Sequence, residues 1–124
     1  MITGKVRENE VVLRIRVFDP AGGSHDVEAV IDTGFSSSMS LPWSIVSRLK
    51  LPWQAIDRST LGDGSECVFN VYEAIIDWDG ELKTVRIHQS ETEPLIGMEL
   101  LQGFEVNFKV RQNGKVTIKR LPKR

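Results

Sequence analysis

Residues 11–34 constrain the fold of this 124-residue chain more than any other segment. Apolar and polar residues alternate over residues 11–18, which is the pattern of a half-buried β-strand. Residues 19–23, Asp-Pro-Ala-Gly-Gly, indicate a turn, and residues 25–31 form a returning apolar strand. The two strands therefore form a hairpin that places Asp32-Thr33-Gly34 at the end of its second strand.

The rest of the chain carries mostly strand signals. Further strands are predicted over residues 54–61, Glu66–Trp78, residues 82–88, 104–108 and 116–118. The turns between them contain Asp63-Gly64, Asp79-Gly80 and Asn113-Gly114. Two short helices are predicted, one carrying Ile45, Val46 and Leu49 between Pro42 and Pro52, the other over residues 98–102, ending at Gly103. We predict an all-β chain, mainly β with two short helices, forming one domain over residues 1–124.

Charge and composition exclude several classes of partner. Sixteen basic and seventeen acidic residues give a net charge of −1, so no overall field attracts nucleic acid or an anionic membrane. No segment approaches the length of a membrane span, and the first residues carry no apolar stretch typical of a signal peptide. The single cysteine, Cys67, excludes an internal disulfide. We expect a cytoplasmic protein that binds neither nucleic acid nor membrane.

Three elements occur in a characteristic order. Asp32-Thr33-Gly34 places a carboxylate, a hydroxyl and a residue without a side chain after a buried strand, and it occurs once. A glycine-rich hairpin follows at Gly62-Asp63-Gly64. Leu95-Ile96-Gly97 comes last, with Ile96 64 positions after Asp32. Over residues 11–108 this pattern resembles the retropepsin-like (retroviral-type) aspartic proteases, and in particular their small bacterial and archaeal single-domain members.

The resemblance implies a closed acid-protease β-barrel that is half of a two-fold dimeric enzyme. It implies an aspartic-type endopeptidase, a hydrolase of peptide or protein substrates, without cofactor or metal. Asp32 would be the catalytic acid, Thr33 would hydrogen-bond across the homodimer, and Gly34 would let the backbone pass close to substrate. The residues implied in substrate binding and in the flap are Phe35, Leu61, Gly62, Asp63, Gly64 and Leu95. Ile96 and Gly97 would support the catalytic loop from below.

Some residues depart from the family pattern. Many retroviral members pair an acid with an arginine at the positions held here by Ser36 and Met98, so the dimer requires another brace. The serines at 36–38 either donate to peptide backbone or satisfy a tight loop. Asp63 is either a turn residue or a carboxylate that faces the catalytic pair.

Three further points bear on function. His25 and His88 lie on strand-like segments without further ligands at metal-binding spacing, so no metal site is expected. The edge of the strand at residues 116–118 could contribute to dimer pairing. The alternative to a peptidase is a catalytically silent peptide-binding or oligomerisation module on the same fold.

Overall fold

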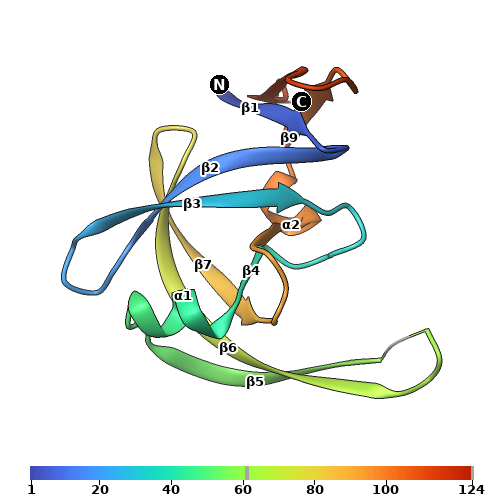
Figure 1. Ribbon diagram of the computed structural model, residues 1–124. Helices are drawn as coiled ribbons and strands as arrows, with labels where there is room; N and C mark the ends of the chain where they lie inside the picture. Colours follow the sequence, from blue (N-terminus) through green and yellow to red (C-terminus); the bar gives the residue numbers. More distant parts are fainter. Residues whose placement is uncertain (61, 124) are drawn as a thin grey trace.

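The computed structural model describes residues 1–60 and 62–123, and most of these residues lie in β-strands (Figure 1). The strands are β1 (Ile2–Arg7), β2 (Glu10–Phe18), β3 (Ser24–Ile31), β4 (Met39–Leu41), β5 (Trp53–Thr60), β6 (Glu66–Trp78), β7 (Glu81–Gln89), β8 (Leu95–Ile96), β9 (Phe104–Phe108) and β10 (Lys115–Arg120). The helices are α1 (Trp43–Arg48) and α2 (Met98–Leu101). The prediction of a mainly β fold with two short helices is confirmed.

The strands form one sheet in the order β5-β6-β7-β4-β8-β3-β2-β1-β10-β9, and β6 also pairs with β2. That additional pairing joins Arg16–Phe18 to Ile75–Asp77 and completes a ring of six strands. The ring depends on short strands, because β8 has two residues and β4 three. Strands β5 and β9 stand at the two ends of the order. The other four strands, β5, β1, β10 and β9, lie outside the ring. The sheet as a whole therefore stays open, and the predicted closed barrel is not clearly formed.

The core follows from the alternation in the long strands. Leu13, Ile15 and Val17 of β2 are buried, whereas the intervening arginines are exposed. In the same way β6 turns Ile76 and Trp78 inward. A residue in a strand points to the opposite face from its neighbours, so one side of each strand is removed from water. The resulting cluster unites side chains of β1, β2, β3, β4, β6, β7, β8, β10 and both helices.

Two strands were not anticipated from the sequence. β1 has the weak pattern Ile-Thr-Gly-Lys-Val-Arg and forms a strand because it pairs with both β2 and β10. β4 has three residues and lies between β7 and β8. Because β10 pairs with β1 on one side and β9 on the other, the expectation that its edge pairs across a dimer is wrong. In the part of the chain that the structure describes, β9 and not β10 forms the edge at this end of the strand order.

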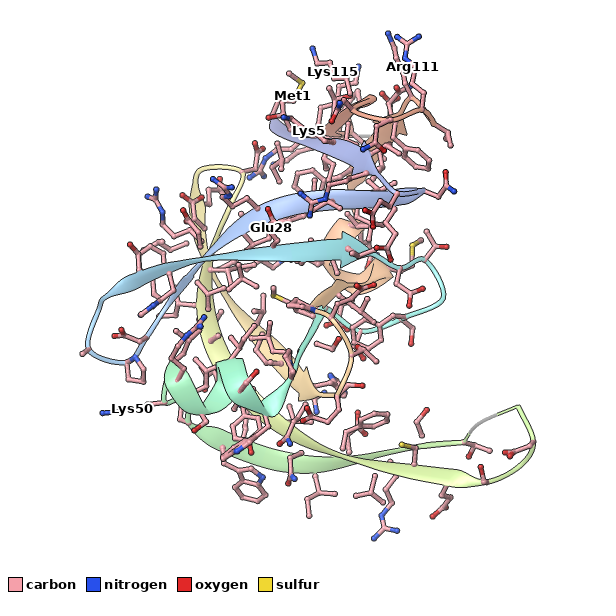
Figure 2. All side chains as sticks on the ribbon, viewed as in Figure 1. Met1, Lys5, Glu28, Lys50, Arg111 and Lys115 are labelled. Atoms are coloured by element: carbon pink, nitrogen blue, oxygen red, sulfur yellow. The ribbon has the colours of Figure 1, made fainter. Side chains whose placement is uncertain are left out.

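The β5–β6 hairpin and the loop after β3 lie on the same side of the molecule, at the right of Figure 1. The two termini lie at the opposite end from the hairpin, with β1 and β9 (Figure 1). Lys5, Arg111 and Lys115 extend from this terminal end, away from the β5–β6 hairpin (Figure 2). Among the described residues, no helix has the length and apolar character needed to cross a membrane.

Adjacent residues of β6 provide a direct test of the packing. Ile76 is 0% exposed and Ile75 is 44% exposed. We expect Ile76→Ala to lower the free energy of unfolding by about 2–5 kcal/mol, because it leaves a cavity in the core. The matched variant Ile75→Ala should lower it by less than about 1 kcal/mol. Urea unfolding of both variants at one protein concentration measures the difference, and equal losses would contradict this placement of β6.

Candidate active site

Asp32 lies directly after β3 in a tight loop whose own backbone holds the carboxylate. Its backbone N–H donates to the carbonyl of Ile96 at 2.9 Å. Its Oδ1 accepts the N–H of Gly34 at 2.9 Å, and its carbonyl accepts the N–H of Phe35 at 3.1 Å. Asp32 is half-buried, whereas Thr33 and Gly34 are exposed. The loop therefore presents an oriented carboxylate at the surface, followed by an accessible hydroxyl.

A second loop packs beneath the first. β8 lies between β3 and β4, parallel to β3 with Ile31 opposite Ile96 and antiparallel to β4 with Met39 opposite Ile96. The N–H of Gly97 donates to the carbonyl of Ser38 at 2.9 Å. A Cβ atom at Gly97 would lie 2.0 Å from the carbonyl oxygen of Ser37. Only glycine fits this crossing, so the structure brings Ile96 and Gly97 directly against the Asp32 loop.

The two loops are also joined near Ser36 and Met98. Ser36, Met98 and Glu99 line the same surface pocket. The buried Ser38 donates its hydroxyl to Oε1 of Glu99 at 2.7 Å, and the N–H of Met98 donates to the carbonyl of Phe35 at 2.8 Å. Ser38 thus satisfies the loop itself, which is one of the two roles the sequence left open for the serines.

A pocket of about 440 Å³ opens beside Asp32. Its lining residues are Asn9, Glu10, Val11, Val30, Ile31, Asp32, Thr33, Glu93, Leu95 and Phe108. The pKa of Glu10 is raised, chiefly because its protonated form shares a hydrogen bond with Glu93. Loss of water and repulsion from the same carboxylate add to the effect. The lining of the pocket therefore combines apolar side chains with the carboxylates of Glu10, Asp32 and Glu93.

Sequence reasoning placed Leu95 in this site and missed Glu10, Glu93 and Phe108. Their segments are distant from Asp32 in the sequence and meet it through strand pairing. Val12, close to Glu10, pairs with Val30 at the end of β3. Nothing in the local sequence around Glu10 or Glu93 marks such a role.

The tip of the β5–β6 hairpin contains three of the residues assigned to the flap. Oδ1 of Asp63 accepts the N–H of Ser65 at 2.9 Å and its hydroxyl at 2.5 Å. The hydrogen bond from the Ser65 hydroxyl is the main reason that the pKa of Asp63 is lowered. Gly64 has φ +87°, a conformation that favours glycine, and Gly62 is exposed. Asp63 is thus used within the turn, and Leu61 falls outside the described residues.

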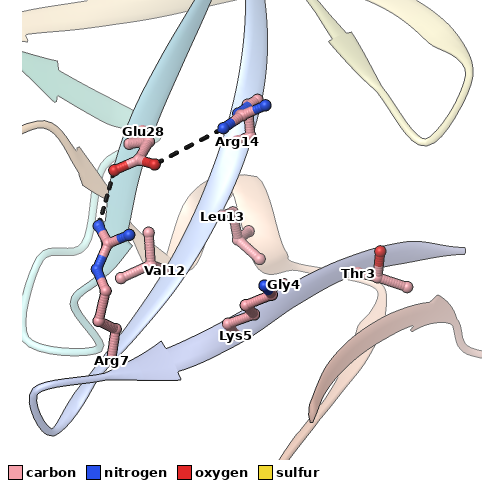
Figure 3. Close-up of a pocket in the computed structure, with 8 residues that line it drawn as sticks. All are labelled: Thr3, Gly4, Lys5, Arg7, Val12, Leu13, Arg14 and Glu28. Carbon is pink, nitrogen blue, oxygen red and sulfur yellow. Dashed lines mark hydrogen bonds and ion pairs between the residues drawn. The ribbon is translucent and has the colours of Figure 1, made fainter. Parts of the chain in front are cut away.

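Another pocket lies away from Asp32, on the outer surface of β1, β2 and β3 (Figure 3). Glu28 accepts a hydrogen bond from Arg7 at 2.7 Å and lies 3.9 Å from Arg14, so its own charge is compensated. Because Lys5 also lines the pocket, basic side chains outnumber the single carboxylate. The pocket holds none of the residues predicted for the site. Within residues 1–60 and 62–123, no three His, Cys, Asp or Glu side chains form a group that could hold a metal ion.

Comparison with known proteins supports the fold. No protein-family model matches the sequence, and no curated protein matches it. Among solved structures, the fold is similar to the crystal structure of a retropepsin-like aspartic protease from Rickettsia conorii, with a TM-score of 0.58 and 17% sequence identity. The similarity covers 98% of this chain and 91% of that one. The retropepsin-like fold that the sequence indicated is therefore confirmed.

The crossing at Gly97 gives a stability prediction. We expect Gly97→Ala to lower the free energy of unfolding by about 1–3 kcal/mol, because its Cβ would force two backbone carbonyls apart. Gly62→Ala is the matched control, since a Cβ at Gly62 meets no atom within 4 Å. Thermal and urea unfolding compare the two variants. A Gly97→Ala protein as stable as the Gly62→Ala protein would contradict the close approach of the two loops.

The raised pKa of Glu10 gives a pH-dependent prediction. A carboxyl with a raised pKa binds more protons in the folded than in the unfolded state, so its contribution to stability falls as pH rises above the ordinary glutamate value. Glu10→Gln should therefore raise the free energy of unfolding near pH 7 and leave it nearly unchanged near pH 4. Urea unfolding at the two pH values measures this.

The control is Glu105→Gln, which removes a carboxylate paired with Lys119 at 3.3 Å and should not stabilise the protein at either pH. High salt should reduce the gain from Glu10→Gln, because it screens the repulsion. A stabilisation of equal size at both pH values would show that charge at Glu10 is not its cause.

Proposed function

We propose that the protein is an aspartic endopeptidase that acts as a homodimer, with one Asp32-Thr33-Gly34 loop from each chain. The observation that carries the proposal is the held carboxylate: backbone hydrogen bonds fix Asp32 after a half-buried strand, beside an open pocket. A residue needed only for folding gains nothing from this exposure. The retropepsin-like fold supports the same assignment.

Catalysis would require two carboxylates that face each other. At a separation of about 3 Å they cannot both be ionised cheaply, so the pair shares one proton and titrates as a unit. The ionised Asp32 takes a proton from a water molecule, whose oxygen attacks the scissile carbonyl carbon. The protonated Asp32 of the partner chain gives its proton to the carbonyl oxygen. The gem-diol then collapses, the C–N bond breaks, and the leaving nitrogen takes up a proton.

Each neighbouring residue has a defined part in this scheme. The N–H of Gly34 holds Oδ1 of Asp32, which fixes the plane of the carboxylate before substrate arrives. Thr33, which is exposed, would use its hydroxyl to hydrogen-bond across the two-fold axis. Leu95 would contribute apolar surface beside the scissile bond, and Glu10 with Glu93 would make the pocket unfavourable for acidic side chains.

The dimer follows from the number of carboxylates. One chain contributes one Asp32, and a two-fold axis brings identical surfaces together. For the two carboxylates to approach, that axis must pass close to Thr33. Phe108 is 43% exposed and lines the pocket next to Thr33, so it supplies apolar surface in this region.

A peptide-library digest over roughly pH 3.5–7.5 tests the proposal. We expect Asp32→Asn to lower the cleavage rate at least about 100-fold, because it removes the acid and base. The matched control is Asp26→Asn on the same strand, β3, which should cleave at the wild-type rate. Acidic residues should be depleted next to the cleaved bonds. Cleavage that is unchanged in Asp32→Asn would sink the proposal and leave a peptide-binding or oligomerisation module on this fold.

Mixing experiments test the shared site. If both chains contribute Asp32, exchange of wild type with an equal amount of Asp32→Asn leaves about a quarter of the dimers fully wild type. Activity per total protein should then fall to about a quarter, whereas an active monomer would retain about half. Light scattering of the same samples reports the dimer. A protein that cleaves as a strict monomer would overturn the dimeric mechanism.

A further inference from the structure

His88 is a buried histidine of β7 that the proposed mechanism does not use. It is 5% exposed, and its Nε2 lies 2.9 Å from Oδ2 of Asp57. Asp57 belongs to β5, the outer strand of the β5–β6 hairpin. Since a carboxylate can only accept, Nε2 carries the proton and donates to Asp57. The side chain of His88 on β7 thus holds strand β5 of the hairpin by a polar contact.

Two aromatic rings complete the surroundings of His88. Phe69 of β6 meets its ring at 5.8 Å between centroids with an interplanar angle of 74°. Phe35 of the Asp32 loop meets it at 5.9 Å with an angle of 86°. Both are edge-to-face contacts, the favoured arrangement for such rings. The imidazole therefore contacts the hairpin through Asp57 and Phe69, and the catalytic loop through Phe35.

The path from His88 to Asp32 is short. Phe35 contacts the imidazole with its ring and donates its backbone N–H to the carbonyl of Asp32 at 3.1 Å. On the other side, Asp57 and Phe69 are cross-strand partners in the β5–β6 hairpin. A displacement of the hairpin would therefore move the imidazole and, through Phe35, the catalytic loop.

Stability alone does not account for a histidine at this position. Nδ1 of His88 is buried and has no hydrogen-bond partner among the described residues. The same is true of Oγ of Ser40, which pairs in register with His88 on the neighbouring strand β4. A buried polar atom without a partner destabilises the folded state, and an apolar side chain would fill this space without that penalty. The hydrogen bond to Asp57 is the contact that an apolar side chain at this position would not make.

The hydrogen bond from His88 also affects the pKa of Asp57. Its pKa is lowered, chiefly by the hydrogen bond from His88, with a further contribution from the N–H of Arg58. The ionised carboxylate is therefore the form that binds His88. The other charge that acts on Asp57 in the same direction is Arg86, also on β7.

We propose that His88 is a positioning residue that couples the β5–β6 hairpin to the Asp32 loop, through Asp57 and Phe69 on one side and Phe35 on the other. The effect of this coupling on peptide cleavage rests on the proposed function. The coupling itself is a property of the folded chain, so it can be measured without any substrate.

Hydrogen exchange of the free protein, followed by mass spectrometry, tests the coupling. We expect His88→Leu to increase exchange at least about threefold both in the hairpin strands, residues 53–60 and 66–72, and in residues 32–38. Asp57→Asn should change the same segments in the same direction, and the double variant should exceed His88→Leu little, because both changes remove one hydrogen bond. His88→Gln, which keeps a donor, should restore part of the protection.

The matched control is His25→Gln. His25 makes the same kind of contact, with Nε2 2.8 Å from Oδ2 of Asp19, but in the hairpin between β2 and β3. The His25→Gln variant should leave hydrogen exchange in residues 53–60, 66–72 and 32–38 unchanged. If His88→Leu does not fold, Asp57→Asn tests the same bond from a side chain that is 43% exposed.

Kinetics then separates positioning from a simple loss of folded protein. Loss of active protein lowers the apparent kcat and leaves KM unchanged, whereas a misplaced hairpin raises KM, by about threefold or more. Faster exchange in the hairpin alone, with residues 32–38 unaffected, would overturn the coupling, as would unchanged exchange in both. If wild type cleaves no peptide but the exchange of both segments rises together, the coupling stands and the proposed function fails.

Discussion

The close crossing of two backbone segments at Gly97 is the contact on which the site depends. There the loop after β8 passes within a backbone's width of residues 35–38, and a Cβ atom would collide with two carbonyl oxygens. The carbonyl of Ile96, directly before Gly97, accepts the backbone N–H of Asp32, so the same segment also anchors the start of the Asp32 loop. Within that loop, the hydrogen bond from the N–H of Gly34 to Oδ1 of Asp32 orients the carboxylate.

The same crossing explains how the chain dispenses with an ionic brace. An acid–arginine pair would hold the two loops by charge, but here backbone hydrogen bonds and the Ser38–Glu99 contact hold them within one chain. Hydrogen bonds within one chain do not require charges to be matched across a dimer. In the proposed dimer, association of the two chains would then rest on shape and apolar surface near Thr33, which would make it sensitive to protein concentration.

Sequence reasoning succeeded where the signal is local. Alternation in β2 and β6, the Asp63-Gly64 turn and the glycine at Gly103 specify their structures without reference to distant residues, and Gly103 indeed has φ +87°. It failed for β1 and β4, whose few residues become strands only because neighbours on both sides complete their hydrogen bonds. Glu10 beside Asp32 escaped it for a related reason, because strand register and not local pattern brings them together.

His88 illustrates why a buried polar contact between distant segments is hard to identify from a sequence pattern. His88 breaks the alternation of buried and exposed residues in β7, since Ile87 and His88 are both buried. A half-buried strand shows one buried face, so two consecutive buried residues mean that something covers both faces. On the face of His88 that cover is the β5–β6 hairpin with Phe35. The break in alternation therefore marks the place where the hairpin folds back over the sheet, and a polar side chain there contacts both the hairpin and the Asp32 loop.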